Sequence, residues 1–251
     1  FQLEKKSKGG DAIYVWGEEN NGIDMYRVNI SHFPLTMEAL WNVECCNPGI
    51  GTDMVLGGKF LYFWYNSKVF KVDPNNGKTI DSFNVIKGSE GASMAYGNNN
   101  IYLYNERFLY KYDLSTNSLD KQVETNAASV GWEGKKIAVA GNTIHLVGSA
   151  SYIHKIDATT LQETSRSGVS VPPYRPYHKS HIRYYNGNIY TLGSLSPGGD
   201  NIGIAVNGGK FGAGQCNTRS QGCYVFRYGR YYADELIVAN DYIYYFAGDS
   251  L

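Results

Sequence analysis

One feature recurs along the whole chain: a turn of small residues leads directly into a short strand rich in aromatic residues. Gly and Asn form these turns, and both tolerate the positive φ that two-residue hairpins require. The copies are GGKFLYFW, GNNNIYLY, GNTIHLV, NGNIYTL and ANDYIYYF. The strand recurs, at intervals of 40 to 54 residues, at Ile13, Leu61, Ile101, Ile144, Ile189 and Ile243. A period near this length with four strands per unit is typical of a β-propeller.

A second signature follows the first in the same units. It is an alternating strand that ends in Asp before a polar turn, as in VFKVDPNNGK, FLYKYDLSTN and YIHKIDATTL, with MYRVNIS as a looser copy. The Asp side chain at such a position accepts hydrogen bonds from turn amides two residues further on. The stretch 51–82 contains both signatures and is predicted to form a complete four-stranded meander.

These repeats predict an all-β fold, a β-propeller of four-stranded blades that forms one domain over residues 1–251. The 22 Tyr and 29 Gly of the chain agree with many strands and many tight turns. Six aromatic strands favour six blades, with five as the alternative. The last unit is short, so we expect the two termini to close the ring. In that arrangement residues 1–6 form the third strand of the last blade, beside the C-terminal strands.

The net charge and the cysteine content restrict the class of protein to which this chain can belong. The formal net charge is zero, which gives no indication of nucleic acid or an anionic membrane surface as partner. No apolar run reaches the roughly 18 to 20 residues of a membrane helix. Four cysteines allow two disulfides with three connectivities, or a vicinal Cys45–Cys46 bond, or free thiols. With the sequon at Asn29 and a first residue that is Phe rather than Met, they favour a processed, secreted or surface protein. The cysteines are Cys45, Cys46, Cys216 and Cys223.

One part of the chain resembles the second blade of olfactomedin domains. The matching positions are Gly51-Thr52, Met54-Val55, the aromatic strand 60–63 and Val72-Asp73. The resemblance implies an extracellular propeller. The Asp-rich calcium stretch of that family is replaced here by EGASMAYGN, and its N-terminal cysteine is not in place. Olfactomedin calcium binding therefore does not transfer to this chain.

Carboxylates precede several of the first strands, which would line a central channel. Asp53, Glu90 and Asp234 are predicted to converge there and to bind Ca²⁺, the one candidate cofactor. The imidazoles of His178 and His181 would add a transition-metal alternative. A channel metal would make the protein a calcium-dependent hydrolase or lactonase. The competing interpretation is that these residues cap the starts of strands.

Two loop segments are candidate binding sites. The segment 171–178 is rich in Pro and Tyr, and its Tyr174, Arg175, Tyr177 and His178 are suited to stacking on a sugar or a peptide. The insertion 194–222 is too long for a hairpin loop, and a Cys216–Cys223 disulfide would display Asn217 and Arg219. The alternatives are a packed connector for the first segment and a strand at 202–206 for the second.

The sequence therefore predicts a secreted or cell-surface recognition protein that binds an extracellular glycan or protein through the loops of one propeller face. A metal-dependent hydrolase is the alternative, and a structural matrix or adhesive protein is the second alternative. The chain has no nucleophile elbow, phosphate-binding glycine motif or CxxC zinc pattern, so an enzyme is not favoured. Oligomeric state follows from none of these patterns.

Overall fold

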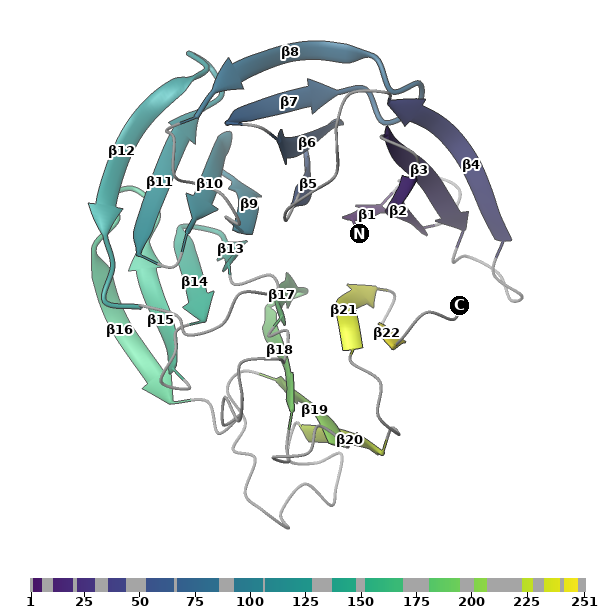
Figure 1. Ribbon diagram of the computed structural model, residues 1–251. Coiled ribbons are helices and arrows are strands. Elements are labelled where there is room, and N and C mark those ends of the chain that lie inside the picture. Colours follow the sequence, from purple (N-terminus) through teal and green to yellow (C-terminus); the bar gives the residue numbers. More distant parts are fainter. Residues whose placement is uncertain are drawn as a thin grey trace.

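The computed structural model of the chain contains β-strands as its regular elements (Figure 1). It describes residues 2–5, 11–19, 22–29, 36–43, 53–65, 67–85, 93–105, 107–127, 137–147, 152–168, 181–194, 201–206, 223–227, 233–239 and 242–247. The strands are β1 (Gln2–Lys5), β2 (Asp11–Glu19), β3 (Gly22–Asn29), β4 (Thr36–Val43), β5 (Met54–Gly57), β6 (Phe60–Tyr65), β7 (Lys68–Val72), β8 (Thr79–Asn84), β9 (Ser93–Gly97), β10 (Asn100–Tyr104), β11 (Phe108–Asp113), β12 (Ser118–Glu124), β13 (Ile137–Ala140), β14 (Thr143–Val147), β15 (Tyr152–Asp157), β16 (Glu163–Gly168), β17 (His181–Tyr185), β18 (Asn188–Ser194), β19 (Asn201–Val206), β20 (Cys223–Arg227), β21 (Ala233–Ala239) and β22 (Tyr242–Ala247). In the described part of the chain no helix has the length and apolar character needed to cross a membrane.

The strands form antiparallel meanders in chain order. Four-stranded sheets are formed by β1–β4, β5–β8, β9–β12, β13–β16 and β17–β20, and β21 pairs with β22. Figure 1 shows the first strands β5, β9, β13, β17 and β21 nearest the centre and the fourth strands at the periphery. Each first strand contacts the first strand of the next sheet, and β1 also contacts β21. The predicted all-β fold built from four-stranded antiparallel units is confirmed.

The small-residue turns join the first and second strands, and every aromatic strand of the sequence pattern is the second strand of its sheet. The turn residues have the expected backbone. Asn98 and Asn99 both have positive φ, as do Asn186 and Gly187. Gly58 and Gly141, the first central residues of their turns, have positive φ as well. Positive φ at both central residues is the property of the type I′ turn, which matches the right-handed twist of the strands.

The Asp-containing turns join the third and fourth strands, and their hydrogen bonds are those predicted. Asp73 Oδ1 accepts the backbone N–H of Asn75 at 2.9 Å, and Asp113 Oδ1 accepts that of Ser115 at 2.7 Å. Asp157 Oδ1 accepts the N–H groups of residues 159 and 160, at 2.9 and 2.7 Å. These local bonds end the third strand at the same place in three sheets, so the sheets share one register.

The N-terminal strand corrects one prediction. β1 pairs with β2, with Gln2 opposite Tyr14 and Lys5 opposite Asp11, and is the first strand of the first sheet. Residues 1–6 are therefore not the third strand of the last sheet. A connection of five residues brings β1 to β2, whereas pairing with the C-terminal strands would close a loop of most of the chain. The shorter closure costs less conformational entropy.

Two strands were missed or misplaced by the sequence patterns. β20 follows the Gly-rich insertion and was not predicted, while β19 confirms the alternative interpretation of a strand at 202–206. The sequence predicted a strand over residues 161–164, whereas β16 begins at Glu163 and extends to Gly168. Its sequence, ETSRSG, has no apolar alternation because it is an exposed edge strand and buries no side chain among residues 163–167.

The described core lies between neighbouring sheets. We call the apolar cluster between β5–β8 and β9–β12 the first seam and the cluster between β9–β12 and β13–β16 the second seam. The first seam contains Val55, Tyr62, Trp64, Val69, Phe83, Val85, Met94, Ile101, Leu103, Tyr110 and Tyr112. The second seam contains Ala95, Tyr102, Tyr104, Leu109, Ala127, Ile137, Ile144, Leu146, Ile156, Ala158 and Leu161. Burying one such large side chain contributes about 1.5–3 kcal/mol.

Glycine at the end of the first strand lets adjacent sheets approach closely. A Cβ atom on Gly57 would lie 2.5 Å from the ring of Tyr96, and one on Gly97 would lie 2.3 Å from Val139 Cγ1. Both distances are far below van der Waals contact. The two glycines therefore set the spacing of the inner strands on the two sides of the β9–β12 sheet.

Candidate functional site

The connections between strands lie at two ends of each sheet. The turns between first and second strands and between third and fourth strands share one end, which we call the hairpin end. The connections from second to third strands and from one sheet to the next lie at the opposite end, the far end.

The two predicted binding segments are anchored at opposite ends. Residues 169–180 connect β16 to β17 at the far end, and residues 207–222 connect β19 to β20 at the hairpin end. The topology therefore does not anchor both segments on one face, as the recognition hypothesis assumed. The candidate residues themselves lie outside the described residues: Tyr174, Arg175, Tyr177, His178, Asn217 and Arg219.

Of the predicted metal ligands, only the Asp53 side chain is described. Its Oδ1 accepts the N–H of Met54 at 2.8 Å, and its Oδ2 accepts the N–H of Met94 at 2.7 Å. The carboxylate thus joins the start of β5 to the start of β9, which is the capping role of the competing interpretation. Glu90 lies outside the described residues, and Asp234 is in β21 with its side chain undescribed. Among the residues that are described, no group of three His, Cys, Asp or Glu side chains is placed to hold a metal.

The remaining predicted sites stay predictions. Cys45, Cys46 and Cys216 lie outside the described residues, and Cys223 begins β20 with its side chain undescribed. Asn29, the predicted glycosylation site, is the last residue of β3 and is half-buried.

The described residues do form one site that the sequence patterns did not indicate, and it arises from a difference between the two seams. The sheets share one register, so each position in the first seam has an equivalent in the second. Phe83 is paired with Val69 on β7, and Val123 is paired with Leu109 on β11 in the same place. On the opposing wall, Tyr110 of the β9–β12 sheet is replaced by His154 of the β13–β16 sheet.

The second seam is therefore filled by smaller and more polar side chains at its outer part. In the first seam, Phe83 packs against Tyr112 with ring centroids 5.5 Å apart, and Val85 is buried beside it. In the second seam, Val123 is only half-buried, and Thr125 stands where Val85 stands. Less apolar volume between the same backbones leaves space that water or a ligand fills.

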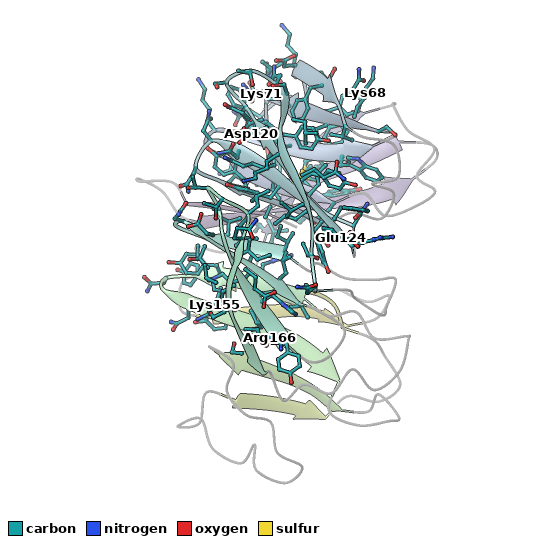
Figure 2. The ribbon with its side chains drawn as sticks, turned by 90° about the vertical axis from the view of Figure 1, so that its left-hand side faces the viewer. Lys68, Lys71, Asp120, Glu124, Lys155 and Arg166 are labelled. Carbon is teal, nitrogen blue, oxygen red and sulfur yellow. The ribbon has the colours of Figure 1, made fainter. Side chains whose placement is uncertain are left out.

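An open groove of about 480 Å³ lies along the outer edge of this seam. It is lined by Asn126, Glu163, Thr164, Ser165 and Arg166. Asn126 follows β12, and the other four belong to the edge strand β16. Figure 2 views this outer edge and shows Arg166 on its strand, with Glu124 at the end of the neighbouring β12. All five lining residues are exposed, and they supply amide, hydroxyl, carboxylate and guanidinium groups.

The wall formed by β15 and β16 carries a connected set of side chains. The guanidinium of Arg166 lies 5.5 Å from the centre of the Tyr152 ring, a cation–π distance. Tyr152 is 37% exposed and meets the His154 ring edge-on, with centroids 6.4 Å apart. His154 is only 4% exposed, and its Nδ1 lies 3.3 Å from Glu163 Oε1 without the alignment of a hydrogen bond.

Bonds between the two sheets hold the hairpin end of the second seam together. Asn98 Nδ2 donates to Gly141 O at 3.1 Å, and Lys121 Nζ donates to the carbonyl of Thr160 at 2.6 Å. Between them, Tyr102 Oη donates to Ala158 O at 3.3 Å. Burial, together with the charges of Asp120 and Asp157, raises the pKa of Tyr102 to about 12, so the hydroxyl keeps its proton. The groove therefore lies in a seam whose two walls are linked by directional bonds.

A closer comparison of the repeats would have indicated this site. YIHKID differs from FLYKYD by His in place of the first interior Tyr, and the strand after FLYKYD has Val123 where the strand after VFKVD has Phe83. Both changes reduce the apolar volume of one seam. Turns and aromatic strands indicate local structure, and neither indicates which faces of two sheets pack together.

No protein-family model matches the chain, so the resemblance of residues 49–78 to olfactomedin domains gains no support, and no curated protein matches either. Among solved structures, the chain is similar to BamB from Moraxella catarrhalis. The likeness covers 98% of this chain and 79% of that chain, with 12% sequence identity and a TM-score of 0.48. At this identity and score the likeness implies nothing about activity.

Proposed function

We propose that this chain is a closed propeller of six blades that acts as a recognition module for an extracellular glycan, with the groove of the second seam as its binding site. The observation that carries the proposal is the groove itself, an open polar site between two sheets, with a partly exposed aromatic ring, Tyr152, against its lining residue Arg166.

The ring is supported by the order of the inner strands. Each of β1, β5, β9, β13 and β17 contacts the next first strand, and the contact between β21 and β1 joins the last sheet to the first. A ring of this kind is one domain over residues 1–251 and should unfold as one cooperative unit.

The chemistry of the lining supports a polyhydroxylated ligand. Asn126 offers both a carbonyl and an amino group, and Glu163 offers acceptor oxygens to hydroxyl groups. The exposed part of the Tyr152 ring offers an apolar surface for the C–H face of a sugar. None of these groups is arranged as a nucleophile with an adjacent base, so binding rather than catalysis is the function that the groove supports.

The setting is supported by sequence features alone. The sequon at Asn29 and the four cysteines favour an oxidising, secreted or cell-surface environment. The extracellular partner is therefore proposed to be a glycan of a cell surface or matrix.

The test is a glycan array with the native protein and two matched variants. Asn126→Trp places a large ring in the groove, whereas Gln122→Trp places the same ring on an exposed residue of β12 that does not line it. We expect glycan signals from the native protein and Gln122→Trp, and their loss in Asn126→Trp. Signals that survive Asn126→Trp would show that the groove is not the site, and an array without any signal would refute glycan recognition.

A further inference from the structure

The charges at the outer parts of the two seams differ in one respect. Arg107 stacks on Phe108 with 5.2 Å between guanidinium carbon and ring centre, and its Nε is 2.8 Å from Glu124 Oε1. Arg166 lies over Tyr152, the ring that takes the place of Phe108 in the next sheet, although it reaches that ring from the fourth strand. Within the described residues, Arg166 makes no ion pair or hydrogen bond.

Stacking orients the guanidinium of Arg166 without using its N–H donors. A guanidinium fixed in this way presents a planar fork that matches a carboxylate, with two parallel hydrogen bonds. Glu163, the acid on the same strand, also lines the groove and has one oxygen 3.3 Å from His154 Nδ1, and within the described residues no ion pair joins it to Arg166. The groove therefore contains one oriented cation whose anionic partner is not supplied by the described chain.

The edge strand adds backbone groups to the site. β16 pairs with β15 alone among the described strands, so alternate N–H and C=O groups along it point away from the sheet. These outward-pointing backbone groups are suited to the hydroxyl groups of a ligand, which both donate and accept hydrogen bonds. A long acidic peptide would need a groove that continues along the molecule, whereas about 480 Å³ fits a small ligand.

We propose that the groove binds a saccharide that carries a carboxylate, with Arg166 as the residue that recognises the carboxylate and Tyr152 as the ring that holds both the arginine and the sugar. Asn126 and Glu163 bind the hydroxyl groups in this arrangement. This inference rests on the proposed glycan recognition and adds the class of sugar and the residue that selects it.

The experiment compares two probes that differ only at one carbon. Methyl β-D-glucuronide carries a carboxylate where methyl β-D-glucoside carries a hydroxymethyl group. Affinities are measured by titration with NMR chemical-shift perturbation, for the native protein and for Arg166→Ala, Arg166→Lys and Arg107→Ala. Arg107→Ala is the control, since it removes an arginine from the ring of Phe108, which takes the place of Tyr152 in the preceding sheet.

For the native protein we expect the glucuronide to bind about tenfold or more tightly than the glucoside, as a charge-assisted pair of hydrogen bonds implies. Arg166→Ala should remove this preference, because neither sugar then has a charge-assisted partner in the groove. Arg166→Lys should keep part of it, and Arg107→Ala should keep all of it. The preference should also shrink between 50 and 500 mM salt.

The contrary outcomes separate the two proposals. Equal affinity for both sugars in the native protein would overturn carboxylate recognition and leave glycan binding intact. A preference that persists in Arg166→Ala would overturn the role of this residue. Hexaglutamate is titrated as a further probe, and its binding without that of either sugar would overturn the saccharide class. Binding of none of the three probes would refute the proposed function as well.

Discussion

The first and second seams are built from the same repeat in the same register, yet one is closed and the other opens into a groove. Phe83 and Tyr110 both belong to the first seam, and Val123 and His154 take the equivalent places in the second. The backbone hydrogen bonds, the turns and the inner glycine are alike on both sides. The repeated backbone is therefore common to both seams. The side chains at a few outward positions decide whether a seam is filled core or a binding site.

The largest expected effect comes from truncating the filled seam. Phe83→Ala removes a buried ring that packs on Tyr112, and we expect the free energy of unfolding to fall by about 3–5 kcal/mol. Val123→Ala at the equivalent position should cost only about 1 kcal/mol, because Val123 is half-buried beside open space. Urea denaturation of both variants measures the difference. Equal losses would mean that the two seams are equally packed.

The seam between the β13–β16 and β17–β20 sheets contains a buried histidine, so its contribution to stability depends on pH. His145 takes the place that Tyr62 and Tyr102 have in earlier sheets, and it is 7% exposed with no hydrogen-bond partner for Nδ1. Burial, with a smaller contribution from the charge of Lys155, lowers the pKa of His145 to about 4 from its ordinary 6.5. The unfolded chain therefore takes up this proton first as pH falls.

We expect the free energy of unfolding to decrease as pH falls from about 6.5 to 4, by up to about 3 kcal/mol from this group alone. Turn hydrogen bonds lower the pKa of Asp113 and Asp157 below their ordinary 3.8, so these acids titrate below that window. His145→Phe should flatten the dependence, measured by urea denaturation at pH 7 and pH 4.5. The same slope in this variant would assign the effect to other groups.

The smallest effect is expected from converting the open seam into the closed one. Val123→Phe introduces the residue of the first seam, and filling existing space should raise the free energy of unfolding by about 1 kcal/mol. It should also narrow the groove and weaken sugar binding. Leu119→Phe, an exposed position on the same strand, is the control and should change neither. A loss of 1–3 kcal/mol in Val123→Phe would indicate overpacking and no spare volume.

Much of the fold was predictable because its signals are local. The positive φ of Asn98 and Asn99 and the bonds from Asp113 and Asp157 to their own turns depend on neighbours in the chain. Strand β16 was misplaced because an exposed edge strand has no apolar alternation to read. The groove was missed because no single segment contains it: Asn126 and Arg166 are 40 residues apart and belong to different sheets.

By itself, the sequence determined the all-β class, the four-stranded unit and its turns, since alternation, glycine and capping by Asp act within a few residues. Tertiary structure decided that β1 joins β2, that Asp53 caps two sheets, and that the second seam opens into a polar groove. The physical reason is the same in each case. Which side chains meet across a seam depends on the register of sheets far apart in the chain, and the volume they leave between them appears only when both walls are in place.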